Sequence, residues 1–126
     1  MKYDKPYVAP TLTVDAVIFQ ITNGALEVLL IKRANDPFKD AWALPGGYNA
    51  AGEMTISALH RIVKQKAGVD TVKDLAYIEQ LYTFDTVDRD PRGHAVSVTY
   101  LGCGRDITVR GAGSHTAFLD VSNLLS

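Results

Sequence analysis

The sequence predicts a single α/β domain in which strands and helices form layers. Two segments, residues 13–19 and 26–31, are rich in β-branched residues and apolar at nearly every position. Strands of this kind favour a sheet that is covered on both faces, which suggests an α/β/α layering. Residues 55–66 instead carry apolar side chains at helical spacing. The length of 126 residues fits one domain, residues 1–126, and excludes a second of similar size.

The first two predicted strands form a hairpin. The run 13–19 ends at Thr22-Asn23-Gly24, and an Asn-Gly pair takes the positive φ angles of a tight turn. Residues 34–47 then form an irregular connection that contains two prolines and two glycines, with Trp42 and Leu44 expected as buried anchors. Connections of this length usually serve a function.

The rest of the chain predicts one helix and three more strands. The helix has its apolar stripe at Ile56, Leu59 and Val63 and ends before Gly68. Strands are predicted over residues 77–84, 95–101 and 117–121, with a polar loop over residues 85–93. Five aromatic side chains are expected mostly in the core: Phe19, Phe38, Trp42, Tyr48 and Phe84.

Composition excludes several classes of protein. Thirteen Lys and Arg against fourteen Asp and Glu give a net charge of -1, so the whole molecule has no positive field for nucleic acid or an anionic membrane. Cys103 is the single cysteine, which excludes an intrachain disulfide. Neither a signal peptide nor an apolar run of about 20 residues is present. We therefore expect a cytoplasmic protein without a membrane partner.

Several common motifs are missing. Residues 102–107 lack the third glycine of a dinucleotide fingerprint, and neither a phosphate loop nor a Gly-x-Ser-x-Gly elbow is present. The side chains that prefer zinc are too scattered in sequence to suggest a metal cluster. These are His60, His94, His115 and Cys103.

One fixed spacing does carry information about chemistry. Gly47 is followed after five residues by Glu53, after seven more by Arg61, and after six more by Gly68-Val69. Together with the preceding residues 42–46, this spacing resembles the Nudix box. Residues 79–84 and the Arg89-Asp90-Pro91-Arg92-Gly93 stretch most resemble the ADP-ribose branch of that family and its regulator relatives.

The resemblance implies a Nudix-like α/β/α sandwich around a mixed β-sheet. The loop and helix from residue 47 to residue 69 would form one wall of a ligand cleft. Nudix-type transcription regulators carry a DNA-binding domain after this unit, and many relatives carry a C-terminal helix. The 126 residues contain neither. If they are a fragment, the regulator interpretation is favoured; if they are the whole gene product, a free-standing binding protein or a decayed enzyme is favoured instead.

The departures from the family pattern point to lost catalysis. In Nudix hydrolases, glutamates on one helix face hold Mg²⁺ or Mn²⁺ against the diphosphate. This chain has Ile62, Gln65 and Lys66 at three of those positions and keeps only Glu53. The four positions then carry no net charge instead of about -4. We expect metal-independent binding, with no metal cofactor and Glu53 as the only metal ligand if one binds.

No catalytic residue is expected, and Glu53 and Arg61 are read as remnants of the box. The resemblance implies that Arg61 braces the loop. Glu53 either orders that loop through Arg61 or stabilises the helix N-terminus. Ile62 either lines a drier pocket or reflects decay after activity was lost.

Seven residues are candidates for ligand contacts: Arg33, Gly46, Gly47, Tyr48, Lys66, Arg89 and Arg92. A guanidinium at Arg33 suits paired phosphate oxygens, although a solvated charge at a strand end is the simpler interpretation. Tyr48 is the first candidate for stacking on a base. The loop that holds Arg89 and Arg92 faces either the ligand or a dimer partner, unless it is merely exposed.

The leading functional hypothesis is recognition of ADP-ribose or a related nucleoside diphosphate by a ligand-sensing domain. DNA would be contacted only through a domain absent from this chain. A homodimer is expected because relatives often exchange N-terminal strands, here residues 3–13.

Three alternatives remain open. The first is a Mg²⁺-dependent pyrophosphohydrolase that recruits carboxylates outside the helix, such as Glu79, Asp85, Asp88 or Asp90. The second is a sensor of a small sugar, and the third is a purely structural dimerising protomer. His115 lies near the place where some relatives hold a catalytic glutamate.

Overall fold

The computed structural model describes residues 8–109 and 116–124 of the chain. In these residues the order of elements is β1 (Thr11–Thr22), β2 (Ala25–Lys32), β3 (Trp42–Ala43), β4 (Gly46–Tyr48), α1 (Thr55–Ala67), β5 (Leu75–Phe84), β6 (Ala95–Gly104), β7 (Thr116–Asp120) and α2 (Val121–Leu124). Each predicted strand and the predicted helix is present, and the bounds differ by a few residues. No helix in this part of the chain is long and apolar enough to cross a membrane.

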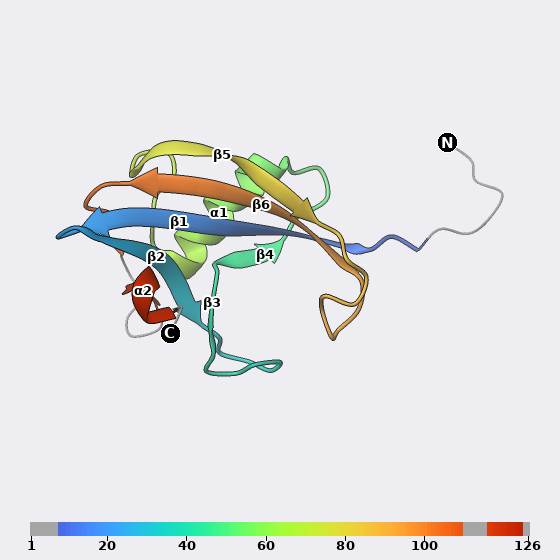
Figure 1. Ribbon diagram of the computed structural model, residues 1–126. Helices are drawn as coiled ribbons and strands as arrows, with labels where there is room; N and C mark the ends of the chain where they lie inside the picture. The colour runs from blue at the N-terminus through green and yellow to red at the C-terminus, as the bar shows by residue number, and fades with distance from the viewer. Residues whose placement is uncertain (1–7, 110–115, 125–126) are drawn as a thin grey trace.

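The strands form one mixed sheet, as predicted (Figure 1). Its path is β3-β2-β1-β6-β5, with β4 added on β1 and β7 on β2. β1 pairs with β6 in parallel along ten residues, whereas the other pairs are antiparallel. The long β1 therefore supports β2 with one half of its edge and β4 with the other, which brings the segment before α1 onto the sheet.

Two local signals in the sequence are confirmed. The β1–β2 turn has positive φ at Asn23 (50°) and Gly24 (80°), as a tight hairpin requires. Helix α1 ends at Gly68, whose φ of 66° is left-handed and whose N–H donates to the carbonyl of Lys64 at 3.0 Å.

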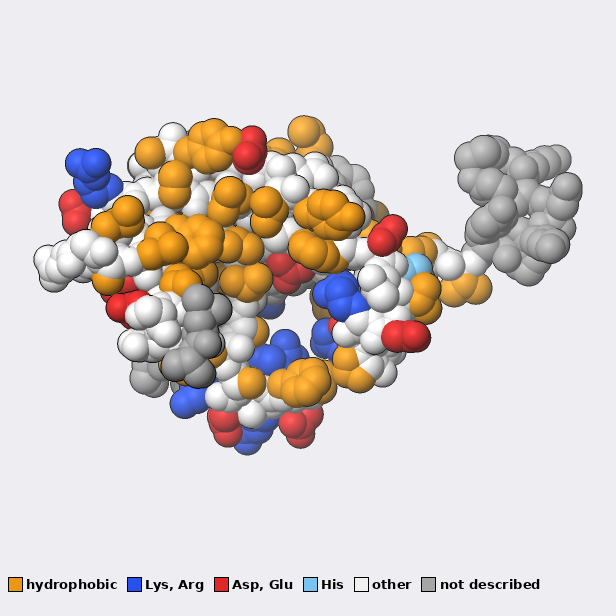
Figure 2. All heavy atoms as spheres, in the orientation of Figure 1, with side chains coloured by type: hydrophobic (Ala, Val, Ile, Leu, Met, Phe, Trp, Pro, Cys, Tyr) orange, Lys and Arg blue, Asp and Glu red, His pale blue; other side chains and the backbone are white. Residues whose placement is uncertain are grey.

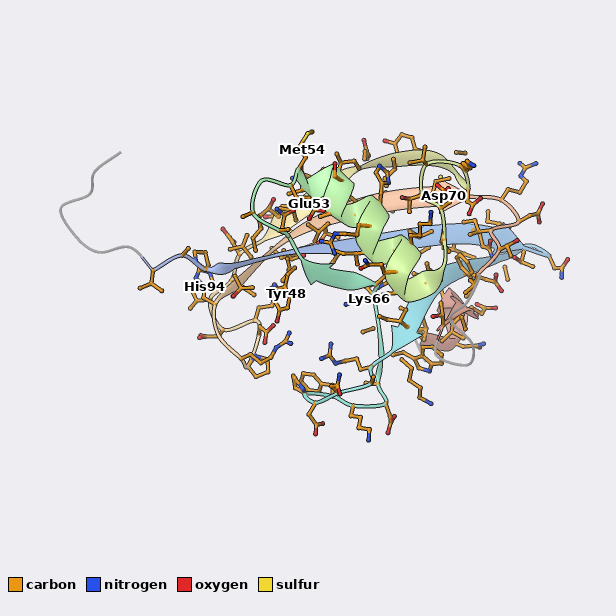
Figure 3. All side chains as sticks on the ribbon, turned by 180° about the vertical axis from the view of Figure 1, so that it is seen from behind. Tyr48, Glu53, Met54, Lys66, Asp70 and His94 are labelled. Atoms are coloured by element: carbon orange, nitrogen blue, oxygen red, sulfur yellow. The ribbon has the colours of Figure 1, made fainter. Side chains whose placement is uncertain are left out.

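The core lies between α1 and one face of the sheet. Figure 3 shows α1 lying across that face. The alternate residues Val14, Ala16 and Ile18 of β1 pack with Leu59 and Val63 of α1, and all five are almost fully buried. Apolar burial of this kind supplies about 25 cal/mol per Å² of covered surface.

The opposite face of the sheet has less cover than its apolar strands predict. Among the described residues only the four-residue α2 lies on that side, as the views from both sides show. Tyr77, Tyr82 and Phe84 of the edge strand β5 are 42% to 62% exposed there. Figure 2 shows hydrophobic side chains gathered on this face. Among the described residues, the α1 side of the sheet is therefore more fully covered than the opposite face.

The prediction that the aromatic residues lie mostly in the core is wrong for four of them. Phe38, Tyr48, Trp42 and Phe84 are 39% to 66% exposed. They occupy a loop, a short strand and sheet edges, where a large ring cannot be enclosed from both sides. The Lys32 ammonium lies 5.8 Å from the ring centroid of the expected anchor Trp42. The anchor of this connection is instead Pro45, which is fully buried.

Candidate ligand-binding site

A cleft opens where β4, the C-terminal end of α1 and two loops meet. The loops follow β2 (residues 33–41) and β5 (residues 85–94), and the cleft volume is about 340 Å³. Figure 2 shows a hollow between these loops, with lysine and arginine side chains around it. The lining residues are Thr13, Asp15, Ile31, Arg33, Ala43, Leu44, Gly46, Gly47, Tyr48, Lys66, Arg89, Asp90 and Arg92.

All seven sequence candidates for ligand contact line this one cleft. They come from four separate parts of the chain: the end of β2, β4, the last turn of α1 and the loop after β5. The lining includes four cationic side chains against the two carboxylates of Asp15 and Asp90. A positively charged, partly enclosed cleft attracts an anionic ligand.

The floor of the cleft is formed by the backbone of β4. Gly46 and Gly47 lie there, and neither has a side chain that would fill the cleft. Gly46 pairs with Asp15 of β1, and a Cβ on Gly46 would lie 1.9 Å from Asp15 Oδ1. Only glycine fits at this approach. The Asp15 carboxylate is itself held by the hydroxyls of Ser97 and Thr13, the second at 3.3 Å.

Lys66 extends from the last turn of α1 to this floor. Its Nζ donates to the Gly46 carbonyl and lies over Gly47, where an added Cβ would be 3.5 Å from it. Burial lowers the pKa of Lys66, while the Asp15 carboxylate acts in the opposite direction. The side chain of Lys66 is exposed at the rim of the cleft, and the bond to Gly46 holds its ammonium over β4.

Arg33 closes the loop that forms one side of the cleft. Its backbone N–H donates to Ala41 and its carbonyl accepts from Asp40, both at 2.9 Å. The side-chain Nε donates to the Pro37 carbonyl at 2.6 Å. The side chain of Arg33 thus both lines the cleft and ties residues 33–41 together.

The two arginines of the β5–β6 loop differ in their partners. Arg89 donates through Nη2 to the Ala95 carbonyl at 3.1 Å. Arg92 donates through Nε and Nη2 to the two oxygens of Asp90, at 3.0 and 2.8 Å. Hydrogen bonding from Arg92 lowers the pKa of Asp90 to about 2, so this pair is charged across the ordinary pH range.

Glu53 and Arg61 lie outside the cleft and brace the loop before α1. Arg61 Nε and Nη2 donate to the two Glu53 oxygens at 2.9 Å each, and Nη2 also donates to the Tyr48 carbonyl at 2.9 Å. Glu53 accepts a further bond from the Ala50 N–H at 3.1 Å. The Arg61 hydrogen bond lowers the pKa of Glu53 to about 2. These contacts agree with the loop-ordering role rather than with a helix cap.

The residues at the box positions do not fit a magnesium ion. Mg²⁺ requires oxygen ligands in near-octahedral geometry. The Glu53 carboxylate is already bonded to Arg61 and Ala50, Ile62 is 2% exposed in the core, and Lys66 brings a cation. No cluster of three or more His, Cys, Asp or Glu suited to a metal occurs among residues 8–109 and 116–124.

The carboxylates named for the hydrolase alternative are not brought together in the cleft. Asp90 lines it but is paired with Arg92, whereas Glu79 lies on β5, and neither Asp85 nor Asp88 is part of the lining. His115 lies outside the described residues.

Sequence reasoning missed Thr13 and Asp15, which line the cleft from β1. Asp15 offered a signal, because it is the only charged residue in the apolar run of residues 13–19. Asp15 lies between Gly46 of β4 and Thr99 of β6 on the sheet, so the polar cluster it forms with Ser97 depends on strands that are 82 positions apart in the sequence.

Comparison with known proteins identifies similar chains. Residues 11–121 match the model of the NUDIX domain. The chain is 40% identical over 96 residues to an ADPR responsive transcriptional repressor of Acinetobacter baylyi, a match that spans 75% of this chain and 37% of the repressor. It is 34% identical over 127 residues to an ADP-ribose pyrophosphatase of Methanocaldococcus jannaschii, covering 98% of this chain and 70% of that protein.

Solved structures give the same result for the fold. The NUDIX domain of Shewanella oneidensis NrtR, crystallised with ADP ribose, superposes with a TM-score of 0.82 at 33% identity, covering 94% of this chain and 78% of that one. A MutT/nudix family protein of Enterococcus faecalis superposes with a TM-score of 0.80 at 34% identity, over 94% of this chain and 47% of that one.

Proposed function

The chain belongs to the NUDIX family, and on that basis we propose that it binds ADP-ribose or a related nucleoside diphosphate without a metal ion and without cleaving it. We propose this as the activity of a ligand-sensing domain. The observation that carries the proposal is Lys66, whose ammonium is fixed on the Gly46 carbonyl inside the cleft.

The cleft supplies the charge that a metal ion would supply to a diphosphate. A hydrolase with a carboxylate cage repels the substrate until a divalent cation screens it. In this chain the ammonium of Lys66 and the guanidinium of Arg33 face the same cleft as the two glycines of β4. A guanidinium and an ammonium form charge-assisted bonds with phosphate oxygens directly.

The relatives support the choice of ligand. The repressor of Acinetobacter baylyi responds to ADPR according to its name, and the Shewanella oneidensis NUDIX domain was crystallised with ADP ribose. Because this chain spans 37% of the repressor, its regulatory role is part of the proposal.

Calorimetric titration of ADP-ribose, with Mg²⁺ and separately with EDTA, tests the proposal. We expect equal affinity in both buffers and intact ligand recovered afterwards. A dissociation constant that rises strongly with EDTA, or AMP in the recovered sample, contradicts metal-independent binding without cleavage. A parallel competition with a free pentose separates a nucleotide site from a sugar site.

The second candidate is a Mg²⁺-dependent ADP-ribose pyrophosphohydrolase. The match to the Methanocaldococcus jannaschii pyrophosphatase over 98% of this chain favours it. Its difficulty is the set of donors, because the two cleft carboxylates, Asp15 and Asp90, are both already hydrogen-bonded. Release of AMP that requires Mg²⁺ and stops with EDTA would establish the pyrophosphohydrolase activity in place of metal-independent binding without cleavage.

Our proposal includes a homodimer and no direct DNA contact. The exposed apolar residues on β5 and the 94% exposed Val8 before β1 are surfaces that association would cover. We propose that contact with DNA is made by a domain outside these 126 residues, because their net charge is -1. Sedimentation at tens of micromolar tests the dimer, and a single monomeric species contradicts it. A chain that binds neither ADP-ribose nor pentose yet dimerises would be the structural protomer.

A further inference from the structure

The cleft continues into a second compartment beyond Tyr48. This space of about 220 Å³ shares four residues with the first compartment, namely Thr13, Tyr48, Asp90 and Arg92. His94 is among the residues that line the second compartment alone. Figure 3 shows Lys66 and Tyr48 toward opposite ends of β4, with His94 on the Tyr48 side. A ligand that reaches from Lys66 to His94 is therefore elongated.

Arg92 is poorly suited to a phosphate contact because its guanidinium is already paired with the carboxylate of Asp90. Asp90 accepts from its Nε and Nη2, and also from its backbone N–H at 2.9 Å. Two parallel bonds to one carboxylate hold the guanidinium plane in a fixed orientation. A planar, paired guanidinium retains its flat face for stacking on an aromatic ring.

Tyr48 supplies a second flat surface at the junction of the two compartments. Its side chain is 63% exposed, although its backbone is fixed on two sides. β4 pairs it with Thr13 of β1, and Arg61 donates to its carbonyl. An exposed aromatic ring on a fixed backbone costs little conformational entropy to use for binding, because it has only two side-chain torsions.

The two compartments differ in chemistry along the strand. Lys66 and Gly46 mark the end that suits phosphate oxygens, and Tyr48 lies two residues farther along β4. Two residues of a strand correspond to roughly 7 Å. This separation places a flat, aromatic-lined compartment beside a cationic one, as a nucleoside diphosphate requires.

We propose that the second compartment is a nucleoside-base subsite in which the base stacks against Tyr48 and the guanidinium of Arg92. This inference rests on the proposed function and deepens it, because it assigns opposite ends of the cleft to the base and to the diphosphate. It gives Arg92, so far a ligand-contact candidate without a stated role, the role of a stacking surface that Asp90 holds in place.

The experiment compares ADP-ribose with inorganic pyrophosphate, which lacks a base, by calorimetry in EDTA. Tyr48→Leu and Arg92→Lys each remove a flat surface, and the lysine keeps the positive charge. We expect each variant to weaken ADP-ribose binding about tenfold and to leave pyrophosphate binding within twofold of the wild type. Tyr48→Phe should retain nearly full affinity. Tyr82→Leu is the matched control, since Tyr82 is 62% exposed on β5 outside both compartments.

The outcomes separate the subsite from the function. If the wild type binds ADP-ribose without metal but Tyr48→Leu and Arg92→Lys bind it normally, the base subsite is wrong and the proposed function stands. The subsite is also wrong if the two variants weaken pyrophosphate binding as much as ADP-ribose binding, because that marks a phosphate contact. If the wild type binds no ADP-ribose, the function and the subsite fail together.

Discussion

Ile62 fills the space directly beneath Gly47, so that a Cβ on this glycine would lie 3.2 Å from two Ile62 carbons. Ile62 is 2% exposed and belongs to the core cluster. Its position explains why this side chain neither lines the cleft nor offers a place for a ligand: the isoleucine joins the glycine loop of β4 to helix α1.

Restoring a glutamate at position 62 should damage the fold rather than restore a metal site. An Ile62→Glu variant places a carboxylate in the buried cluster, so we expect unfolding to become easier by more than about 3 kcal/mol. Denaturant unfolding measures the change. Gln65→Glu is the matched control, because Gln65 is exposed on the same helix, and it should change stability by less than about 0.5 kcal/mol. Equal stability of the two variants contradicts the core role of Ile62.

Gly46 and Gly47 should differ in their tolerance of alanine. At Gly46 the new methyl would lie 1.9 Å from Asp15 Oδ1, whereas at Gly47 it meets the side chain of Ile62 at 3.2 Å. We expect Gly46→Ala to lower the free energy of unfolding by about 1–3 kcal/mol and Gly47→Ala to lower it by less. If chemical denaturation shows a larger loss of stability for Gly47→Ala than for Gly46→Ala, the close contact between Gly46 and Asp15 is not the tighter of the two.

Lys66 should supply a measurable share of the affinity. Lys66→Ala removes the ammonium from the Gly46 carbonyl, and we expect the dissociation constant for ADP-ribose in EDTA to rise about tenfold. Lys64→Ala is the control, since Lys64 is exposed on the same helix and does not line the cleft. An equal effect of the two substitutions would indicate a general loss of positive charge.

The pH dependence of binding should report the same lysine. Partial desolvation in the cleft lowers the pKa of Lys66 from 10.5, so the ammonium loses its proton at a lower pH than a free lysine does. Affinity for ADP-ribose should therefore fall as the pH rises through the lowered pKa of Lys66. Lys66→Arg keeps its charge at these pH values and should flatten the decline. If the affinity of Lys66→Arg falls with rising pH as steeply as that of the wild type, a group other than Lys66 causes the fall.

The contribution of Glu53 to stability should depend on pH in the acid range. Its pKa in the folded protein is about 2, against 4.5 for the free side chain. A carboxylate with a depressed pKa stabilises the fold fully above the free value and loses this effect as the pH falls from about 4.5 toward 2. The melting temperature of the wild type should exceed that of Glu53→Gln at pH 7, and the difference should close in that window. A difference that persists at pH 2 excludes the Arg61 pair as its source.

Local patterns in the sequence determined most of the backbone. The Asn23-Gly24 turn, the apolar stripe of α1 and the glycine after it are consequences of neighbouring residues, because turn and helix geometry depend on nearby torsions. The same spacing placed Glu53 and Arg61 at the loop brace. The seven ligand candidates named from the sequence come from four separate segments and line one cleft.

Tertiary structure decided which side chains are free and which are already engaged. Asp90 neutralises Arg92, the Gly46 carbonyl fixes Lys66, and Asp15 enters the cleft beneath β4. The exposure of Tyr48 and Phe84 also differs from the expected core placement. These properties depend on contacts between segments brought together by the sheet, such as Asp15 and Ser97, which are 82 positions apart. Periodicity in the sequence carries information about one segment at a time, so it reveals the face a residue occupies but not the partner it meets there.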